Sequence, residues 1–99
     1  MPIGDFINFI PPIGFLAIHL AAFVIGAYFA WRSFEAGQGA LGWAFSLYAL
    51  AEIVYMTYHL DWTIFLFAHT IAEVLDLVAF IVIFATVSRT ALTSVRSQA

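Results

Sequence analysis

Long apolar stretches alternate with short polar connections along this chain. Continuous apolar runs cover residues 13–34, 40–59 and 62–87. A helix rises about 1.5 Å per residue, so each run reaches the about 20 residues that are needed to cross about 30 Å of hydrocarbon. Strands of a membrane barrel are shorter, and apolar and polar residues alternate along them. The runs in this chain are longer and do not alternate. The pattern predicts an all-α integral membrane protein, an antiparallel bundle of three transmembrane helices forming a single domain.

Turn-forming and polar residues mark the connections between the runs. The glycine-containing stretch at 37–39 predicts a turn in which glycine adopts the left-handed conformation that ends a helix. The turn at 60–61 is tighter, and Asp61 is predicted to cap the start of the third helix. Residues 1–11 are expected to lie at the membrane interface, and residues 88–99 to form a polar C-terminal tail.

Composition excludes several classes of protein. Of the 99 residues, 65% are hydrophobic and 9% are charged, whereas soluble domains carry about a quarter charged residues. The chain has no Cys and no Lys, which excludes disulfides, thiol chemistry and a lysine Schiff base. The net charge of −3 is dispersed and does not favour nucleic acid. The expected partners are the lipid bilayer and either further copies, in a homo-oligomer, or other membrane subunits.

The arginine residues predict an orientation in the membrane. Arg32, Arg89 and Arg96 are the cationic residues, and with three crossings they all fall on the side of the first hairpin and the C-terminus. Because cytoplasmic loops carry an excess of Lys and Arg, this side is predicted to be cytoplasmic and the N-terminus to lie outside.

Ionisable residues within the runs form stripes at helical spacing. His69, Glu73 and Asp76 fall within an arc of about 60° on the third helix, since successive residues are about 100° apart. Glu52 and His59 share one face of the second helix. These stripes are expected to meet, with a histidine of the first helix pointing into the bundle at a similar depth.

The position of these acids in a membrane needs an explanation. An acid at the centre of a transmembrane helix costs about 2.5 to 3.5 kcal/mol on insertion scales, so Glu73 and Asp76 together cost about 5 to 7 kcal/mol. The acids must therefore be protonated, paired, bound to a metal or hydrated.

A metal site is the first functional hypothesis, with imidazoles and carboxylates as ligands. The candidate ligands are His19, Glu52, His69 and Glu73. This donor set suits Zn, Fe or Cu(II), and the i, i+4 spacing of His69 and Glu73 lets both bind one ion. Supporting or proton-relay roles are predicted for Asp76, His59 and Tyr55.

Three alternatives remain open from the residues alone. The chain could bind haem or a quinone as an accessory or anchor subunit of an electron-transfer complex, because histidines and aromatic side chains are present. It could instead form a homo-oligomer that translocates protons or cations, or use its polar residues only as interhelical hydrogen bonds. The sequence leaves enzymatic activity undecided.

Overall fold

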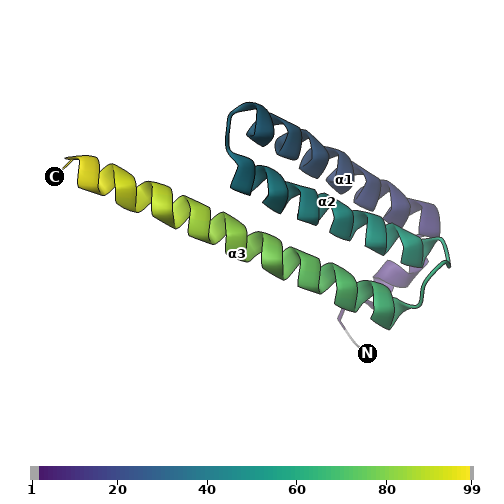
Figure 1. Ribbon diagram of the computed structural model, residues 1–99. Helices are drawn as coiled ribbons and strands as arrows, with labels where there is room; N and C mark the ends of the chain where they lie inside the picture. The colour runs from purple at the N-terminus through teal and green to yellow at the C-terminus, as the bar shows by residue number, and fades with distance from the viewer. Residues whose placement is uncertain (1–2, 99) are drawn as a thin grey trace.

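Helices make up nearly all of the described chain. The computed structural model describes the backbone of residues 3–98 and, apart from positions 5 and 94–98, their side chains. The elements are η1 (Asp5–Phe9), α1 (Pro12–Glu35), α2 (Gly39–His59) and α3 (Phe65–Gln98), shown in Figure 1. No strand is present within residues 3–98. The all-α prediction is confirmed.

All three α-helices are long and apolar enough to cross a membrane. The candidate spans are Pro12–Glu35, Gly39–His59 and Phe65–Thr93. Only a helix or a closed barrel satisfies all of its backbone hydrogen bonds in lipid, so apolar helices of this length are suited to the bilayer. The protein is therefore an integral membrane protein with three transmembrane helices, as the sequence predicts.

α2 lies between the other two helices (Figure 1). It packs against α1 on one side and α3 on the other, whereas no Cα of α1 comes within 8 Å of a Cα of α3 in the described chain. The helices are antiparallel to their neighbours in sequence. The bundle is therefore a row, and one face of α2 is the floor of a groove between α1 and α3.

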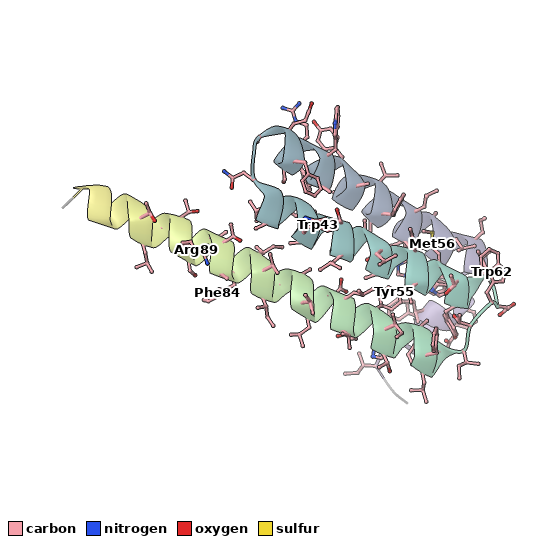
Figure 2. All side chains as sticks on the ribbon, viewed as in Figure 1. Trp43, Tyr55, Met56, Trp62, Phe84 and Arg89 are labelled. Carbon is pink, nitrogen blue, oxygen red and sulfur yellow. The ribbon has the colours of Figure 1, made fainter. Side chains whose placement is uncertain are left out.

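Small residues make the interhelical contacts. Among the side chains that the structure describes, the buried apolar ones are alanines: Ala30, Ala44, Ala49, Ala51, Ala68, Ala72 and Ala79. Large side chains project outward from the three helices, Phe84 of α3 among them (Figure 2). Small residues at interfaces are typical of helices that pack in lipid, where large apolar side chains gain nothing by avoiding the solvent.

Gly37 ends α1 in the expected way. Its φ of 76° is in the left-handed region, and the amides of Gly37 and Gln38 donate to the carbonyl oxygens of Phe34 and Ser33 at 3.1 and 2.8 Å. These two hydrogen bonds form a Schellman motif, which satisfies carbonyl groups that the last turn of a helix leaves free.

The turn between α2 and α3 differs from the prediction. Asp61 has a φ of 64°, its amide donates to the carbonyl oxygen of Tyr58 at 3.0 Å, and that of Trp62 donates to Thr57 at 2.9 Å. Asp61 thus takes the place that glycine has in a Schellman motif, because a short polar side chain tolerates the left-handed region. It ends α2, and α3 begins only at Phe65, so the prediction that Asp61 caps the third helix is wrong.

α3 continues beyond the predicted boundary. The apolar run ends at residue 87, but α3 continues through the segment predicted to be a polar tail as far as Gln98, beyond the α1–α2 hairpin (Figure 1). The sequence after 87 contains no Gly or Pro that would stop a helix. Residues 1–2 of the expected interfacial segment, residue 99 of the tail and the side chain of Arg96 lie outside the described part of the chain.

Candidate intramembrane polar site

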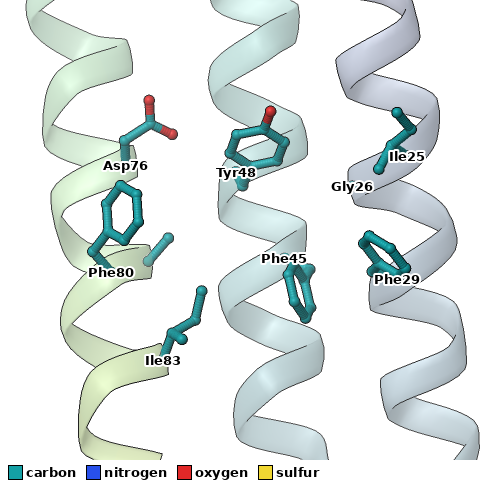
Figure 3. A pocket seen from close by; sticks show the side chains of 9 residues that line it. Ile25, Gly26, Phe29, Phe45, Tyr48, Asp76, Phe80 and Ile83 are labelled. Carbon is teal, nitrogen blue, oxygen red and sulfur yellow. The ribbon is translucent and has the colours of Figure 1, made fainter. Parts of the chain in front are cut away.

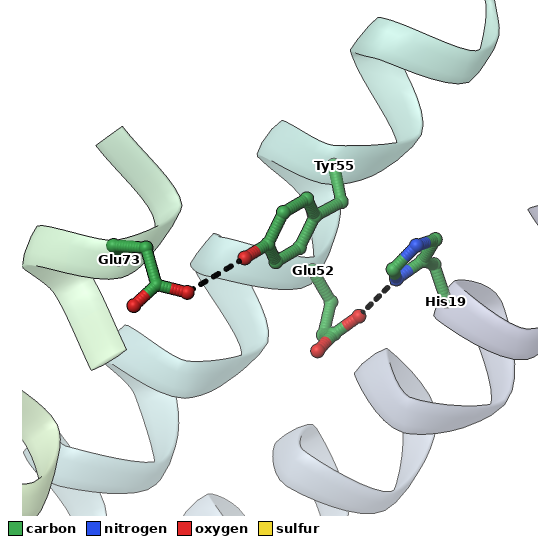
Figure 4. A network of polar contacts seen from close by, with 4 residues as sticks. All are labelled: His19, Glu52, Tyr55 and Glu73. Carbon is green, nitrogen blue, oxygen red and sulfur yellow. Dashed lines mark hydrogen bonds and ion pairs between the residues drawn. The ribbon is translucent and has the colours of Figure 1, made fainter. Parts of the chain in front are cut away.

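Glu52 and His19 form the centre of the site. Nδ1 of His19 on α1 lies 2.5 Å from Oε2 of Glu52 on α2 (Figure 4). Glu52 is 7% exposed and is the buried charged residue of the described chain. The hydrogen bond forms whether His19 donates to a carboxylate or a protonated Glu52 donates to the imidazole. The expectation that His19 points into the bundle at the depth of Glu52 is confirmed.

Aromatic rings enclose the imidazole of His19. The rings of Tyr55 and His59 stack on it with centroid distances of 5.0 and 5.3 Å, and Phe15 stacks on His59 at 5.0 Å. Tyr55 and His59 lie one and two turns from Glu52 along α2. The stacked rings limit the rotation of His19, and thereby orient its Nδ1 toward the carboxyl group.

A second polar pair joins α2 to α3. The hydroxyl group of Tyr55 donates to Oε1 of Glu73 at 3.3 Å (Figure 4). The phenol ring of Tyr55 therefore contacts His19 through its face and Glu73 through its hydroxyl group. The two pairs form a line across the groove, in which each helix contributes an ionisable or hydrogen-bonding side chain.

Asp76 lies deeper along α3 and is placed differently. Its Oδ1 is buried and has no hydrogen-bond partner among the described residues. Figure 3 shows the carboxyl group directed toward Tyr48 of α2. A buried polar atom without a partner is rare in proteins, because the lost hydration is not replaced.

His69 does not join the other candidate ligands. Its side chain is exposed and stacks on Phe65, one turn earlier on α3, with a centroid distance of 5.1 Å. Among the side chains that the structure describes, no group of three or more His, Asp or Glu residues is arranged to hold a metal ion. The four candidate ligands are divided between the His19–Glu52 pair, the Tyr55–Glu73 pair and the exposed His69.

The packing of α3 places the whole stripe of His69, Glu73 and Asp76 beside the helix contact. α3 contacts α2 through Ala68, Ala72 and Ala79. At about 100° per residue, the stripe of His69, Glu73 and Asp76 lies about 60 to 120° around the helix from this alanine seam. The stripe therefore flanks the helix contact, and only its long or inward-leaning side chains reach the groove.

His19 has the donor atom best placed for a cofactor or metal. When Nδ1 carries the proton and donates to Glu52, Nε2 is free to act as an acceptor or ligand. Histidines that bind metals are commonly oriented by a carboxylate on the other ring nitrogen. Glu73, held by one hydroxyl group, retains further lone pairs for an additional partner.

One part of the groove was missed by the sequence reasoning. Phe45, Tyr48, Glu52, Tyr55 and His59 are three or four residues apart and form the floor of the groove on α2. This spacing could have indicated a shared face of α2, because Phe45 and Tyr48 continue the stripe of Glu52 and His59 along the helix. The sequence analysis assigns a role to Tyr55 but none to Tyr48 or Phe45.

Comparisons with family models, with curated protein sequences and with solved structures find no match to this chain.

Proposed function

We propose that this small integral membrane protein binds and releases protons within the bilayer. The observation that carries the proposal is the 2.5 Å contact between His19 and the buried Glu52. A histidine and a glutamate in hydrogen-bond contact share a proton readily, because either group can hold it. Ionisable residues inside a membrane segment commonly mark proton or ion sites.

The second polar pair, Tyr55 and Glu73, is part of the same proposal; we call the two pairs together the proton-binding network. Tyr55 connects the two pairs, because its ring stacks on His19 and its hydroxyl group reaches Glu73. Toward the α1–α2 hairpin, the groove beyond Tyr48 and Asp76 is lined by side chains such as Phe45, Phe80 and Ile83. Apart from Tyr48 and Asp76, the described side chains that line this part of the groove are apolar, which favours proton uptake and release from one side over passage through a single chain.

Assembly and orientation belong to the same proposal. No Cα of α1 lies within 8 Å of a Cα of α3 in the described chain, and the cavity between the helices is lined by the exposed side chains of Phe29 and Phe80. Further copies or other membrane subunits would cover it. We place the α1–α2 hairpin and the C-terminus in the cytoplasm, on the basis of the arginines, so that the His19–Glu52 pair lies nearer the outer surface.

Infrared difference spectroscopy tests the proposal directly. Protein in lipid nanodiscs is titrated between acid and alkaline pH, and the carbonyl stretch of protonated carboxyl groups is recorded. We expect a band that disappears in Glu52→Gln and shifts in His19→Phe. The matched control is Glu35→Gln, which removes an exposed acid that lies 3.6 Å from Arg32. A carboxyl band that is identical in Glu52→Gln would refute the proposal.

A divalent metal ion is the second candidate, and the orientation of His19 favours it. With Nδ1 held by Glu52, Nε2 is free in the tautomer that metal sites use. Glu73 or side chains of a second copy would complete the coordination by Zn, Fe or Cu. Elemental analysis of untagged protein distinguishes the candidates: a stoichiometric metal that is lost in His19→Phe supports this one, and metal at the same low level in both proteins excludes it.

A further inference from the structure

A cavity lies beside the proton-binding network, nearer the α1–α2 hairpin. Its volume is about 270 Å³, slightly below the about 300 Å³ at which the usual range for small-molecule pockets begins. All three helices line it: Gly26 and Phe29 come from α1, Phe45 and Tyr48 from α2, and Phe80 with other side chains from α3. Figure 3 shows these side chains facing a common space between the helices.

The chemistry of the lining is unusual for a lipid-filled groove. Aromatic rings of Phe29, Phe45 and Phe80 line the cavity, and Asp76 supplies a carboxyl group with a buried, unpartnered Oδ1. No basic side chain is among the lining residues. The described residues of the lining thus offer a carboxyl group and aromatic faces in an apolar site, without a basic group of their own.

We propose that this cavity binds a lipophilic amine in its ammonium form. The ammonium group would donate a charge-assisted hydrogen bond to Asp76, while the aromatic rings contact the apolar body and the cation. Because charge and hydrogen bond are both supplied by the ligand, the orphaned oxygen of Asp76 gains the partner that the described chain does not provide.

The ligand has a route from the bilayer. Phe29 and Phe80 are exposed on the surface of the single chain while also lining the cavity. An amphiphilic amine dissolved in the membrane can therefore enter from the side. An acyl chain would fill the apolar part but leave Asp76 without a donor, and a neutral alcohol would supply a donor without the charge.

The experiment compares two probes of nearly the same shape. The amine is 2-(1-naphthyl)ethylamine and the neutral partner is 2-(1-naphthyl)ethanol, both followed by their fluorescence in equilibrium dialysis. Full-length protein in nanodiscs is compared with protein-free nanodiscs at neutral pH, so that partition into lipid is subtracted. The variant is Asp76→Asn, and the control is Glu35→Gln, which removes an acid remote from the cavity lining.

We expect saturable binding of the amine and affinity for the alcohol that is lower by about tenfold or more. Asp76→Asn is expected to weaken amine binding by about 10- to 100-fold, the range typical of a hydrogen bond to a charged group. Glu35→Gln leaves it unchanged.

Three results would overturn the proposal: equal affinity for amine and alcohol, full amine binding by Asp76→Asn, or uptake no greater than that of protein-free nanodiscs. If the Asp76→Asn variant does not fold into nanodiscs, the comparison of the amine and the alcohol on the unaltered protein still tests the proposal. The two proposals can fail separately, because the infrared test is decided by Glu52→Gln, whereas the binding test is decided by Asp76→Asn and the two probes.

Discussion

The interaction between His19 and Glu52 is the feature whose strength can be predicted most sharply. A double-mutant cycle with His19→Phe, Glu52→Leu and the double variant isolates it. Phenylalanine retains a ring that can stack on Tyr55 and His59, which lie 5.0 and 5.3 Å from the imidazole. Leucine retains much of the volume of Glu52 and cannot accept a hydrogen bond. The cycle thus reports the pair rather than the packing around it.

The expected coupling follows from the geometry. Hydrogen bonds between transmembrane helices contribute about 0.6 kcal/mol on average and up to about 1.7 kcal/mol. The His19–Glu52 contact is 2.5 Å long, and the side chains are 20% and 10% exposed. Bonds that involve an ionised group are about twice as strong as neutral ones. We therefore expect a coupling free energy of about 1 to 2 kcal/mol.

A second pair in the same chain provides the control. Arg32 and Glu35 lie 3.6 Å apart, with side chains that are 61% and 49% exposed. Exposed pairs at this spacing contribute about 0.2 to 0.5 kcal/mol. The free energy of unfolding of each variant is measured by denaturing-detergent titration in mixed micelles. The reasoning is refuted if the His19–Glu52 cycle gives no larger coupling than alanine substitutions of Arg32 and Glu35.

Three further predictions concern packing, turns and orientation. The Gly26→Ala variant should be less stable than the Gly39→Ala variant by about 1 to 3 kcal/mol. A Cβ at Gly26 would lie 2.8 Å from Cδ1 of Tyr48, whereas nothing lies within 4 Å of a Cβ at Gly39. Equal thermal stability of the two variants would contradict this prediction. The Asp61→Val substitution should lower the free energy of unfolding by about 1 to 2 kcal/mol, whereas Asp61→Gly should not. The reason is that a φ of 64° suits glycine and is unfavourable for a β-branched residue. The free energies of unfolding are measured by the same detergent titration. Single cysteines are introduced into this cysteine-free chain at Gln38 and Trp62, and a membrane-impermeant thiol reagent added to intact cells should label the Trp62→Cys protein alone; labelling of only the Gln38→Cys protein would reverse the proposed orientation.

The sequence alone determined the number of helices and their antiparallel order. Length and apolar character are local properties, and in lipid each segment must satisfy its own backbone hydrogen bonds. The meeting of His19 with Glu52 was also predictable, because their depths follow from counting residues along the helices. The end of α3 was not found, since Ser, Thr and Arg after residue 87 end an apolar run without ending a helix.

Which partners the polar side chains of α3 find depends on how the helices pack. The seam of Ala68, Ala72 and Ala79 against α2 sets the rotation of α3 and places the stripe beside the helix contact, where Glu73 reaches Tyr55 while His69 stacks on Phe65 of its own helix. The cavity beside Asp76 depends on α1 and α3 standing apart on either side of α2. Sequence periodicity gives the face of each helix, but the contact of small residues between helices fixes how those faces are turned toward one another.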